Sequence, residues 1–321
     1  MSYSLDAKKE ITRVKYALPC CDTARLCALV LSSGSIVLRG AGRFELMLVT
    51  SENSVAQLIV ALLKKEAKIP FDIKVTNVSK LQKAKKYCIR LSDPIEARRI
   101  LMKLGILSCG ESGMSIDRTS WERLFKCDDC FKAFLGGVFC ACGSIINPEH
   151  SNHMEFSLAY EDFATCFSDV LNSRGINCKV HERKNRYMVY IKDAESIIDV
   201  LRATGASDAL FGYENIRIKK EIVNRVNRLM NCDMANQNKT MDAADKDTAC
   251  IEYIVTNKGW DYFPKSLIEI AKLRLENPDV SLASLGTLLS DPIGKSGVNH
   301  RLRKIRQLAA EVAQETEDDT F

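Results

Sequence analysis

The sequence lacks any long hydrophobic run. No stretch of about 18 consecutive apolar residues occurs in its 321 residues, so we expect no transmembrane helix. The first ten residues contain no apolar core of a secretory signal, which leads us to expect a cytoplasmic protein without a membrane partner. The net charge is only +5, so any surface that binds nucleic acid must be a local patch.

Motifs for nucleotide sites are also missing. The chain has neither a GxxxxGK[ST] pattern nor a strand-linked GxGxxG, and we expect no cofactor and no small-molecule substrate. Histidine is scarce, and no two histidines stand at the i, i+4 spacing of a helical metal site. Of the four, only the last is a candidate for a DNA contact, and the others are expected at the surface: His150, His153, His181 and His300.

Cysteine, in contrast, is plentiful. Thirteen cysteines are scattered through helical and strand-like segments, which fits reduced, buried thiols better than a disulfide framework. The pairs Cys127-x-x-Cys130 and Cys140-x-Cys142 raise the alternative of a zinc site. Because the second pair lies inside an apolar helix, where its side chains diverge, we interpret these residues as buried free thiols and expect no metal.

The first two thirds of the chain contain a repeat with a period near 109 residues. Residues 26–36 and 135–145 both read as an apolar helix that ends in Gly-Ser-Ile. The glycines, Gly34 and Gly143, are expected to terminate these helices with a positive φ. Both copies then show the same order of patterns. The first copy has a strand at 44–50, a helix at 52–67, a strand pair at 71–78 with 87–91, and a final helix at 93–104 that ends at Gly105. The second has a strand at 153–159, a helix at 161–173, a strand pair at 177–182 with 187–191, and a final helix at 193–203 that ends at Gly205.

This pattern predicts an α+β protein. Each copy reads α-β-β-α-β-β-α, the two apolar helices form a pair about a pseudo-twofold axis, and an all-α domain follows. The polar segment 231–247 is predicted as a linker or a frayed helix, and the acidic tail as disordered. The predicted boundaries are 1–108 and 109–215 for the repeats, 216–257 for a basic helix and linker, 258–313 for the all-α domain, and 314–321 for the tail.

The all-α domain contains three predicted helices. The first begins with Pro264 in its first turn, and the second is capped by Ser281. A turn at residues 291–294 leads to the third helix, which Ser296 is expected to cap. Two short helices, a tight turn and a basic third helix together are typical of a helix-turn-helix that binds double-stranded DNA.

The third helix carries the predicted contacts. Five basic residues and no acidic residue lie between Lys295 and Arg306. Asparagine and arginine side chains can bind adenine and guanine edges, while lysine and arginine also hold phosphates. The alternative is a solvated basic face of a small helical bundle. The predicted DNA-binding residues are Ser281, Lys295, Ser296, Asn299, His300, Arg301, Arg303, Lys304 and Arg306.

The repeat helices resemble the LAGLIDADG motif of homing endonucleases. The second copy matches better, with Leu135, Gly136, Gly137, Ala141 and Gly143 at the motif's apolar and small positions. The small residues would let two helix backbones approach closely. In that family an acidic residue before the last glycine binds a divalent metal, but here these positions hold Ser33 and Cys142. Mg²⁺ needs hard oxygen ligands, so the resemblance implies a nuclease-like scaffold without nuclease activity.

The whole chain resembles the bacterial WhiA family. The resemblance rests on the two degenerate helices, on residues 225–231 with 235–236 and 239–240, and most specifically on residues 295–303, KSGVNHRLR. It implies a nucleoid-associated transcriptional regulator that acts in cell division, chromosome segregation and, in sporulating bacteria, sporulation. Other transcription or division proteins are further candidate partners. The alternatives are a divergent metal-dependent nuclease and a protein-interaction scaffold.

One further basic segment is open to two interpretations. Lys80, Lys83, Lys85 and Lys86 fall between two predicted strands. We interpret them as a solvated hairpin loop, with additional phosphate contacts as the alternative, because hairpins of the nuclease relatives rest in the DNA groove.

Overall fold

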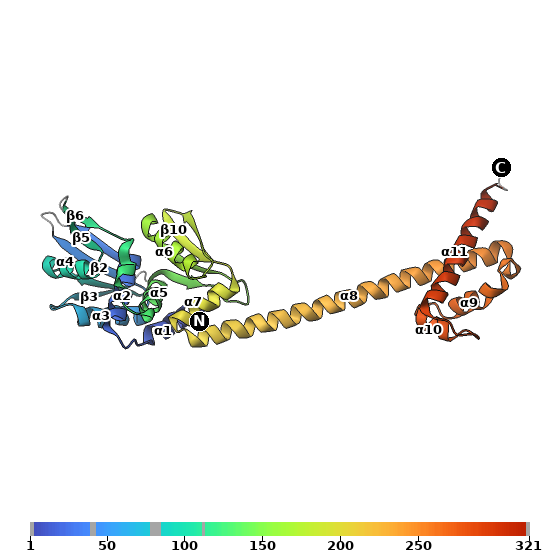
Figure 1. The fold of residues 1–321 in the computed structure, drawn as a ribbon, viewed down its shortest axis with the longest axis horizontal. Helices are drawn as coiled ribbons and strands as arrows, with labels where there is room; N and C mark the ends of the chain where they lie inside the picture. The colour runs from blue at the N-terminus through green and yellow to red at the C-terminus, as the bar shows by residue number, and fades with distance from the viewer. Residues whose placement is uncertain (1–2, 39–42, 78–84, 111–112, 319–321) are drawn as a thin grey trace. The chain divides into compact units, whose positions relative to one another are not determined.

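A computed structural model describes residues 3–38, 43–77, 85–110 and 113–318 of the chain. These residues form two compact units, Met1–Lys220 and Glu221–Phe321 (Figure 1). The division between the units falls inside a single helix, α8 (Ser207–Lys258).

The first unit contains the two predicted repeats. Each repeat builds a four-stranded antiparallel sheet, in the order β1-β2-β4-β3 and β7-β8-β10-β9. The α+β class and the α-β-β-α-β-β-α order of each repeat are therefore confirmed. The first repeat comprises α2 (Pro19–Ser33), β1 (Gly34–Leu38), β2 (Phe44–Thr50), α3 (Asn53–Glu66), β3 (Asp72–Asn77), β4 (Lys85–Leu91) and α4 (Pro94–Lys103). The second comprises α5 (Asp128–Cys142), β7 (Gly143–Ile145), β8 (Met154–Leu158), α6 (Glu161–Ser173), β9 (Lys179–Arg183), β10 (Arg186–Ile191) and α7 (Ala194–Thr204).

Helices α2 and α5 pack against each other at the centre of this unit (Figure 1). A Cβ atom on Gly137 would lie 2.8 Å from the Cβ of Ala28 and 2.8 Å from the carbonyl oxygen of Arg25, so only glycine allows this approach. Gly136 has a different neighbour from the one expected, because its α carbon faces Ile11 of α1 (Tyr3–Arg13) and not α2. The close pairing of two helix backbones through small residues is confirmed for Gly137.

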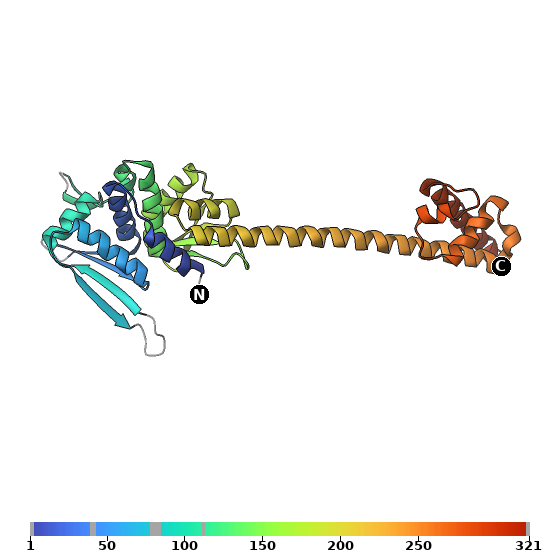
Figure 2. The same cartoon turned by 90° about the horizontal axis from the view of Figure 1, so that it is seen from below.

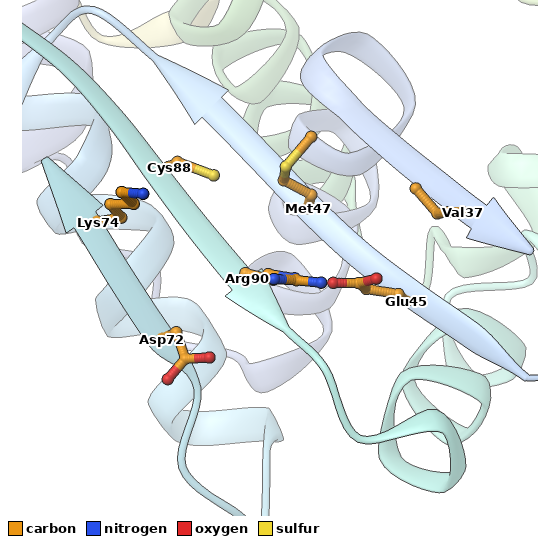
Figure 3. Close-up of a pocket in the computed structure, with 7 residues that line it drawn as sticks. All are labelled: Val37, Glu45, Met47, Asp72, Lys74, Cys88 and Arg90. Carbon is orange, nitrogen blue, oxygen red and sulfur yellow. The ribbon is translucent and has the colours of Figure 1, made fainter. Parts of the chain in front are cut away.

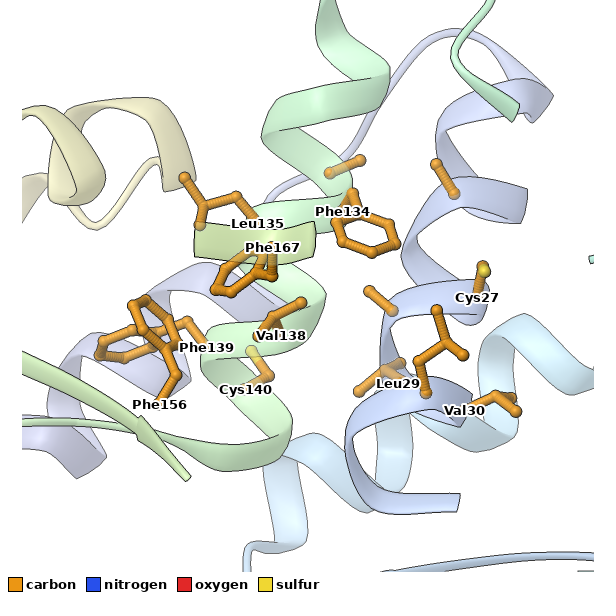
Figure 4. Close-up of a cluster of buried hydrophobic side chains, with 14 of the residues drawn as sticks. Cys27, Leu29, Val30, Phe134, Leu135, Val138, Phe139, Cys140, Phe156 and Phe167 are labelled. Carbon is orange, nitrogen blue, oxygen red and sulfur yellow. The ribbon is translucent and has the colours of Figure 1, made fainter. Parts of the chain in front are cut away.

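Aromatic side chains fill the space between α5 and the second sheet. Phe139 of α5 meets Phe156 of β8 edge to face, with ring centroids 6.1 Å apart, and both lie in the buried cluster shown in Figure 4. Phe134 stacks on Trp121 of the 3₁₀ helix η1 (Ser120–Leu124) with centroids 4.2 Å apart. Each fully buried ring of this kind contributes on the order of 2 kcal/mol to folding, so this core fixes the positions of the helix and the sheet.

The glycines at the ends of α2 and α5 have backbone conformations that differ from the prediction. Gly34 has φ −81° and Gly143 has φ −74°, values that any residue adopts, so the expected positive φ is wrong. Close approach explains them instead: a Cβ on Gly34 would lie 2.4 Å from the carbonyl oxygen of Val30. The positive φ occurs at Gly105 (68°) and Gly205 (76°), just after the last helix of each repeat.

Three elements of this unit have no counterpart in the sequence-based prediction. They are α1, η1 and the hairpin formed by β5 (Leu107–Gly110) and β6 (Gly113–Ile116). Helix α1 packs against α3, α5 and β7 and so joins the two repeats. Figure 2 shows the same elements from a second direction.

Helix α8 replaces the interrupted pattern expected for residues 216–257. Residues 231–247 are helical throughout, so the linker alternative for this segment is wrong. No glycine or proline lies between Gly212 and Gly259, and polar side chains alone do not break a helix. Gly259, with φ 76°, stands directly after the end of α8.

The second unit is a helical bundle with its own core. It contains the end of α8 with η2 (Trp260–Tyr262), α9 (Lys265–Glu276), α10 (Leu282–Thr287) and α11 (Lys295–Asp318). Ile251 and Ile254 of α8 pack with Leu285 of α10 and with Val298 and Leu302 of α11. The bundle therefore uses part of α8 in addition to the three predicted helices.

Three details of this bundle differ from the prediction. Pro264 is the N-cap of α9 and does not lie in its first turn, since its carbonyl accepts from the backbone N–H of Leu267. Ser296 is the second residue of α11 and not its cap, because the N–H of Val298 donates to Gly294. The tail is helical as far as Asp318, and residues 319–321 lie outside the described part of the chain.

Within the described ranges, no helix combines the length and the apolar character that a membrane crossing requires.

Candidate nucleic-acid interface

The first turns of α11 present a basic face to solvent. Val298, Leu302 and Ile305 are fully buried in the bundle, which fixes the rotation of the helix. Lys295, Asn299 and Arg303 stand four residues apart on the exposed side. Ser296, His300 and Lys304 are also exposed and follow the same four-residue spacing. Hydrophobic periodicity therefore points six of the nine predicted DNA-binding side chains outward.

Arg301 and Arg306 are less available than the other basic residues of α11. Arg301 is half-buried and lies near the carboxylate of Glu269. The pKa of Glu269 is lowered mainly by the hydrogen bond from the backbone N–H of Ser290, and to a smaller extent by the positive charge of Arg301. Arg306 donates through Nε to the carboxylate of Asp247, at 2.7 Å. Asp247 is only 1% exposed, so Arg306 compensates a buried charge. A DNA phosphate would have to compete with that carboxylate for Arg306.

Ser281 lies beside the start of α11, although Lys295 follows Ser281 only 14 positions later in the sequence. It caps α10 as predicted, with its hydroxyl oxygen accepting from the backbone N–H of Ser284. A hollow of about 260 Å³ opens between the beginnings of α10 and α11 and is lined by both Ser281 and Lys295. The N-terminus of α11 lies at this hollow, and the N-terminus of a long helix favours a phosphate group.

The hollow also contains residues that the sequence analysis did not place there. Lys239 and Thr240 of α8 line it together with Asn299 of α11. The sequence offered no positional signal for this, because the segment around Lys239 is predicted only as a linker or a frayed helix. Lys239 adds an exposed cation beside the predicted surface.

The turn between α10 and α11 is held by a close backbone contact. The backbone N–H of Ile293 donates to the carbonyl of Gly286 at 3.1 Å. A Cβ on Gly286 would lie 2.1 Å from the carbonyl oxygen of Ile293, so a larger residue would push the turn away. Gly286 thus positions the start of α11, a role that the sequence analysis missed.

The first unit offers a second polar surface, on the open face of its first sheet. Glu45 of β2 forms an ion pair with Arg90 of β4, and Asp72 and Lys74 of β3 line the same hollow of about 490 Å³ (Figure 3). Two carboxylates balance two cations here, so the local charge offers a DNA backbone little net attraction. The exposed side of α11 carries Lys295, Arg303 and Lys304, with no acidic residue between Lys295 and Arg306, which makes it the stronger candidate.

The former metal positions at the ends of α2 and α5 carry no carboxylate. The Ser33 hydroxyl donates to the carbonyl of Leu29 at 2.9 Å, and the Cys142 thiol is 3.4 Å from the carbonyl oxygen of Val138. Burial raises the pKa of Cys142 to about 12, so it stays protonated at neutral pH. The charges that act on Cys142 come from Lys8 and Arg186, both cationic. Neither Ser33 nor Cys142 provides the ionised oxygen that Mg²⁺ requires.

Part of the predicted lysine-rich hairpin lies outside the described residues. Lys80 and Lys83 fall in the interval 78–84, of which nothing is described. Lys85 and Lys86 are exposed at the start of β4, where Lys85 pairs with Asn77 of β3.

Comparison with known proteins places the three parts of the chain in one family. A family model described as the WhiA N-terminal LAGLIDADG-like domain matches residues 19–107, and the WhiA LAGLIDADG-like domain matches residues 131–223. The WhiA C-terminal HTH domain matches residues 226–309, which include the whole basic face of α11.

Curated relatives match along almost the whole chain. A probable cell division protein WhiA from Clostridium acetobutylicum is 38% identical over 315 residues, which is 98% of this chain and 99% of that protein. A second, from Alkaliphilus metalliredigens, is 36% identical over 309 residues, covering 96% of this chain and 98% of that protein. The crystal structure of full-length DUF199/WhiA from Thermatoga maritima matches with a TM-score of 0.59 at 23% identity, over 97% of this chain and 99% of that one, which supports the fold.

Proposed function

The chain belongs to the WhiA family, and from this premise we propose that it binds double-stranded DNA through α11 as a transcriptional regulator in cell division. The role in cell division is supported by the names of relatives with 36–38% identity over nearly the full length. On the family resemblance we also propose roles in chromosome segregation and sporulation and a position at the nucleoid. Transcription or division proteins are proposed as further partners on the same ground. The first unit would serve as an auxiliary platform for DNA or protein.

One observation carries the DNA-binding proposal: the exposed face of Lys295, Asn299 and Arg303 at the N-terminal end of α11. In a helix-turn-helix this end of the recognition helix enters the major groove. Asn299 can make paired hydrogen bonds to adenine and Arg303 to guanine, while Lys295 lies where a phosphate would approach. Ser281 and the N-terminus of α11 line the adjoining hollow and would add further phosphate contacts.

A matched pair of variants tests this assignment. We expect Arg303→Ala to weaken duplex binding about tenfold, which is about 1.4 kcal/mol. If Arg303 neutralises a phosphate, the slope of log affinity against log salt concentration becomes less steep by about one in this variant. Fluorescence anisotropy between about 50 and 200 mM salt measures both quantities.

Lys265→Ala is the control for this experiment. It removes one exposed charge from the same unit, at a residue that does not line the hollow. Its affinity and salt dependence should match those of the wild type. Equal affinity and slope for the Arg303 variant would place the DNA-binding surface elsewhere.

We also propose that the chain does not cleave DNA. The support is chemical, since Ser33 and Cys142 stand at the positions where the related nucleases carry metal-binding acids. Supercoiled plasmid incubated with the protein and Mg²⁺ or Mn²⁺ should remain uncut. Specific cleavage that follows the protein through successive purification steps would restore the nuclease alternative.

A further inference from the structure

Four cysteine thiols converge at one end of the α2–α5 helix pair. The sulfur atoms of Cys20, Cys21, Cys127 and Cys130 all lie within 4.8 Å of one another. Cys127 is the centre of the group: its Sγ is 3.7 Å from that of Cys20, 3.5 Å from that of Cys21 and 3.5 Å from that of Cys130. The first two cysteines come from one repeat and the last two from the other, more than 100 residues later.

The pseudo-twofold pairing of α2 and α5 explains why these residues meet. Cys21 and Cys130 are each the third residue of their helix, and the repeat period of 109 residues relates them. Cys127 is the N-cap of α5, and Cys20 lies in the first turn of α2 beside Pro19. Because both helices begin at this point, the positive ends of two helix dipoles face the cluster, which favours thiolate anions.

We propose that these four cysteines bind one Zn²⁺ ion as a structural tetrathiolate site. Zinc binds thiolates at about 2.3 Å in a tetrahedron, and the edges of such a tetrahedron are about 3.8 Å long. The three sulfur separations around Cys127, 3.5–3.7 Å, fit three of the six edges with little adjustment, and the remaining separations are at most 4.8 Å. Four protein ligands leave no open position, so the site is structural and not catalytic.

The sulfur geometry fits a metal better than a disulfide. A disulfide brings two sulfur atoms to about 2.05 Å, and Cys127 has three neighbouring sulfurs at nearly equal distances, so no single partner is selected. The arrangement also separates these residues from Cys140, which is buried near the other end of α5. The pair Cys140-x-Cys142 therefore takes no part, and the expectation of metal-free thiols is replaced at Cys127 and Cys130.

Proton exchange accompanies zinc uptake at this site. Zn²⁺ and four thiols give one zinc tetrathiolate with charge −2 and release four protons, and no atom is oxidised or reduced. Binding therefore strengthens as pH rises, because fewer protons must be displaced.

The consequence for the fold is a cross-link between the two repeats. Zinc would tie the first turn of α2 to the first turn of α5, at the end of the pair opposite Ser33 and Cys142. A structural zinc ion adds its binding free energy to folding, because the unfolded chain has no such site. Chelation should therefore lower the melting temperature of the first unit.

The test measures metal content in the full-length protein. Protein purified in reducing buffer and dialysed against zinc should contain about one zinc ion per chain by mass spectrometry of the metal. Cys127→Ser and Cys21→Ser should each lower the content at least about fivefold, because three thiolates bind more weakly than four. Cys232→Ser is the matched control, since Cys232 is exposed on α8, and it should keep the full content.

A cobalt titration of the wild-type protein tests the proposed metal site even if the cysteine variants fail to fold. Co²⁺ should produce the intense visible absorption of a tetrahedral cobalt thiolate, which equimolar Zn²⁺ then removes. A folded wild-type chain that binds neither metal would overturn the proposal. So would full zinc content in a folded Cys127→Ser variant, or a disulfide within the cluster, detected by peptide mass, in protein that had been kept reduced.

Discussion

Arg306 illustrates how one residue of the basic helix differs from its neighbours. The sequence places it in the same run of cations as Arg303, but only Arg306 forms an ion pair with a carboxylate that is 1% exposed. An exposed ion pair contributes little to stability, whereas a buried carboxylate left without its partner is costly. Arg306 therefore stabilises the bundle in addition to any contact it makes with DNA.

Replacing this residue should destabilise the second unit. For Arg306→Ala we expect a loss of about 2–3 kcal/mol in the free energy of unfolding, since the buried carboxyl group of Asp247 would lose its hydrogen-bonded partner. Thermal or urea denaturation measures the change. The double variant Arg306→Ala with Asp247→Asn should recover part of the loss. Equal stability of Arg306→Ala and the wild type would show that the ion pair contributes nothing.

At the scale of elements, the stability of the first unit depends on how closely α2 and α5 approach each other. Gly137 meets Ala28 and the backbone of Arg25, with no room for an added methyl group. Alanine favours a helix over glycine by about 1 kcal/mol, so helix propensity and packing oppose each other at this position. Overpacking in a close-packed core costs about 1–3 kcal/mol and should prevail, because the atoms in contact include backbone that cannot rotate away.

Two glycine-to-alanine variants separate these effects. Gly137→Ala should lower the free energy of unfolding by about 1–2 kcal/mol, as measured by chemical denaturation. Gly212→Ala is the control, since its added Cβ would lie 3.4 Å from the Tyr3 hydroxyl, an ordinary contact, so this variant should be neutral or slightly stabilised. The same effect in both variants would mean that helix propensity, and not the contact between helices, governs Gly137.

At the scale of the whole molecule, the two units have different cores and different surfaces. The first has a paired helix core and, on its first sheet, a hollow in which acids and bases balance, as at Glu45 and Arg90. The second has a small core of its own and the exposed cations of α11. The proposed recognition of DNA therefore belongs to the second unit, and the first would modulate it.

A genome-wide measurement of DNA occupancy tests whether the second unit is the one that recognises DNA. We expect the full-length protein to occupy discrete sites and a chain ending at Lys220, where the first unit ends, to lose them. Full-length protein with Arg303→Ala should show the same sites with reduced occupancy. Retention of the sites by the shortened chain would assign DNA recognition to the first unit.

Most of the element order was predictable because it depends on local patterns. Strand β2 and helix α6 have the predicted bounds, since alternating or helical apolar periodicity identifies them without knowledge of their partners. The continuous helix α8 was missed, because its exposed polar residues in 231–247 resemble a linker when burial is unknown. The N-terminus of α11 was misplaced by two residues, which changes Ser296 from a cap into a helical residue.

The sequence by itself determined the basic character of α11, the absence of acids at Ser33 and Cys142, and the duplication, because each depends on residue identity and spacing. Only the tertiary structure decided which side chains meet. It paired Arg306 with Asp247, 59 residues away, and brought Lys239 to the hollow beside Asn299. It also gathered four cysteines of two repeats at one end of a helix pair. Such contacts follow from how the helices pack, which local periodicity cannot specify.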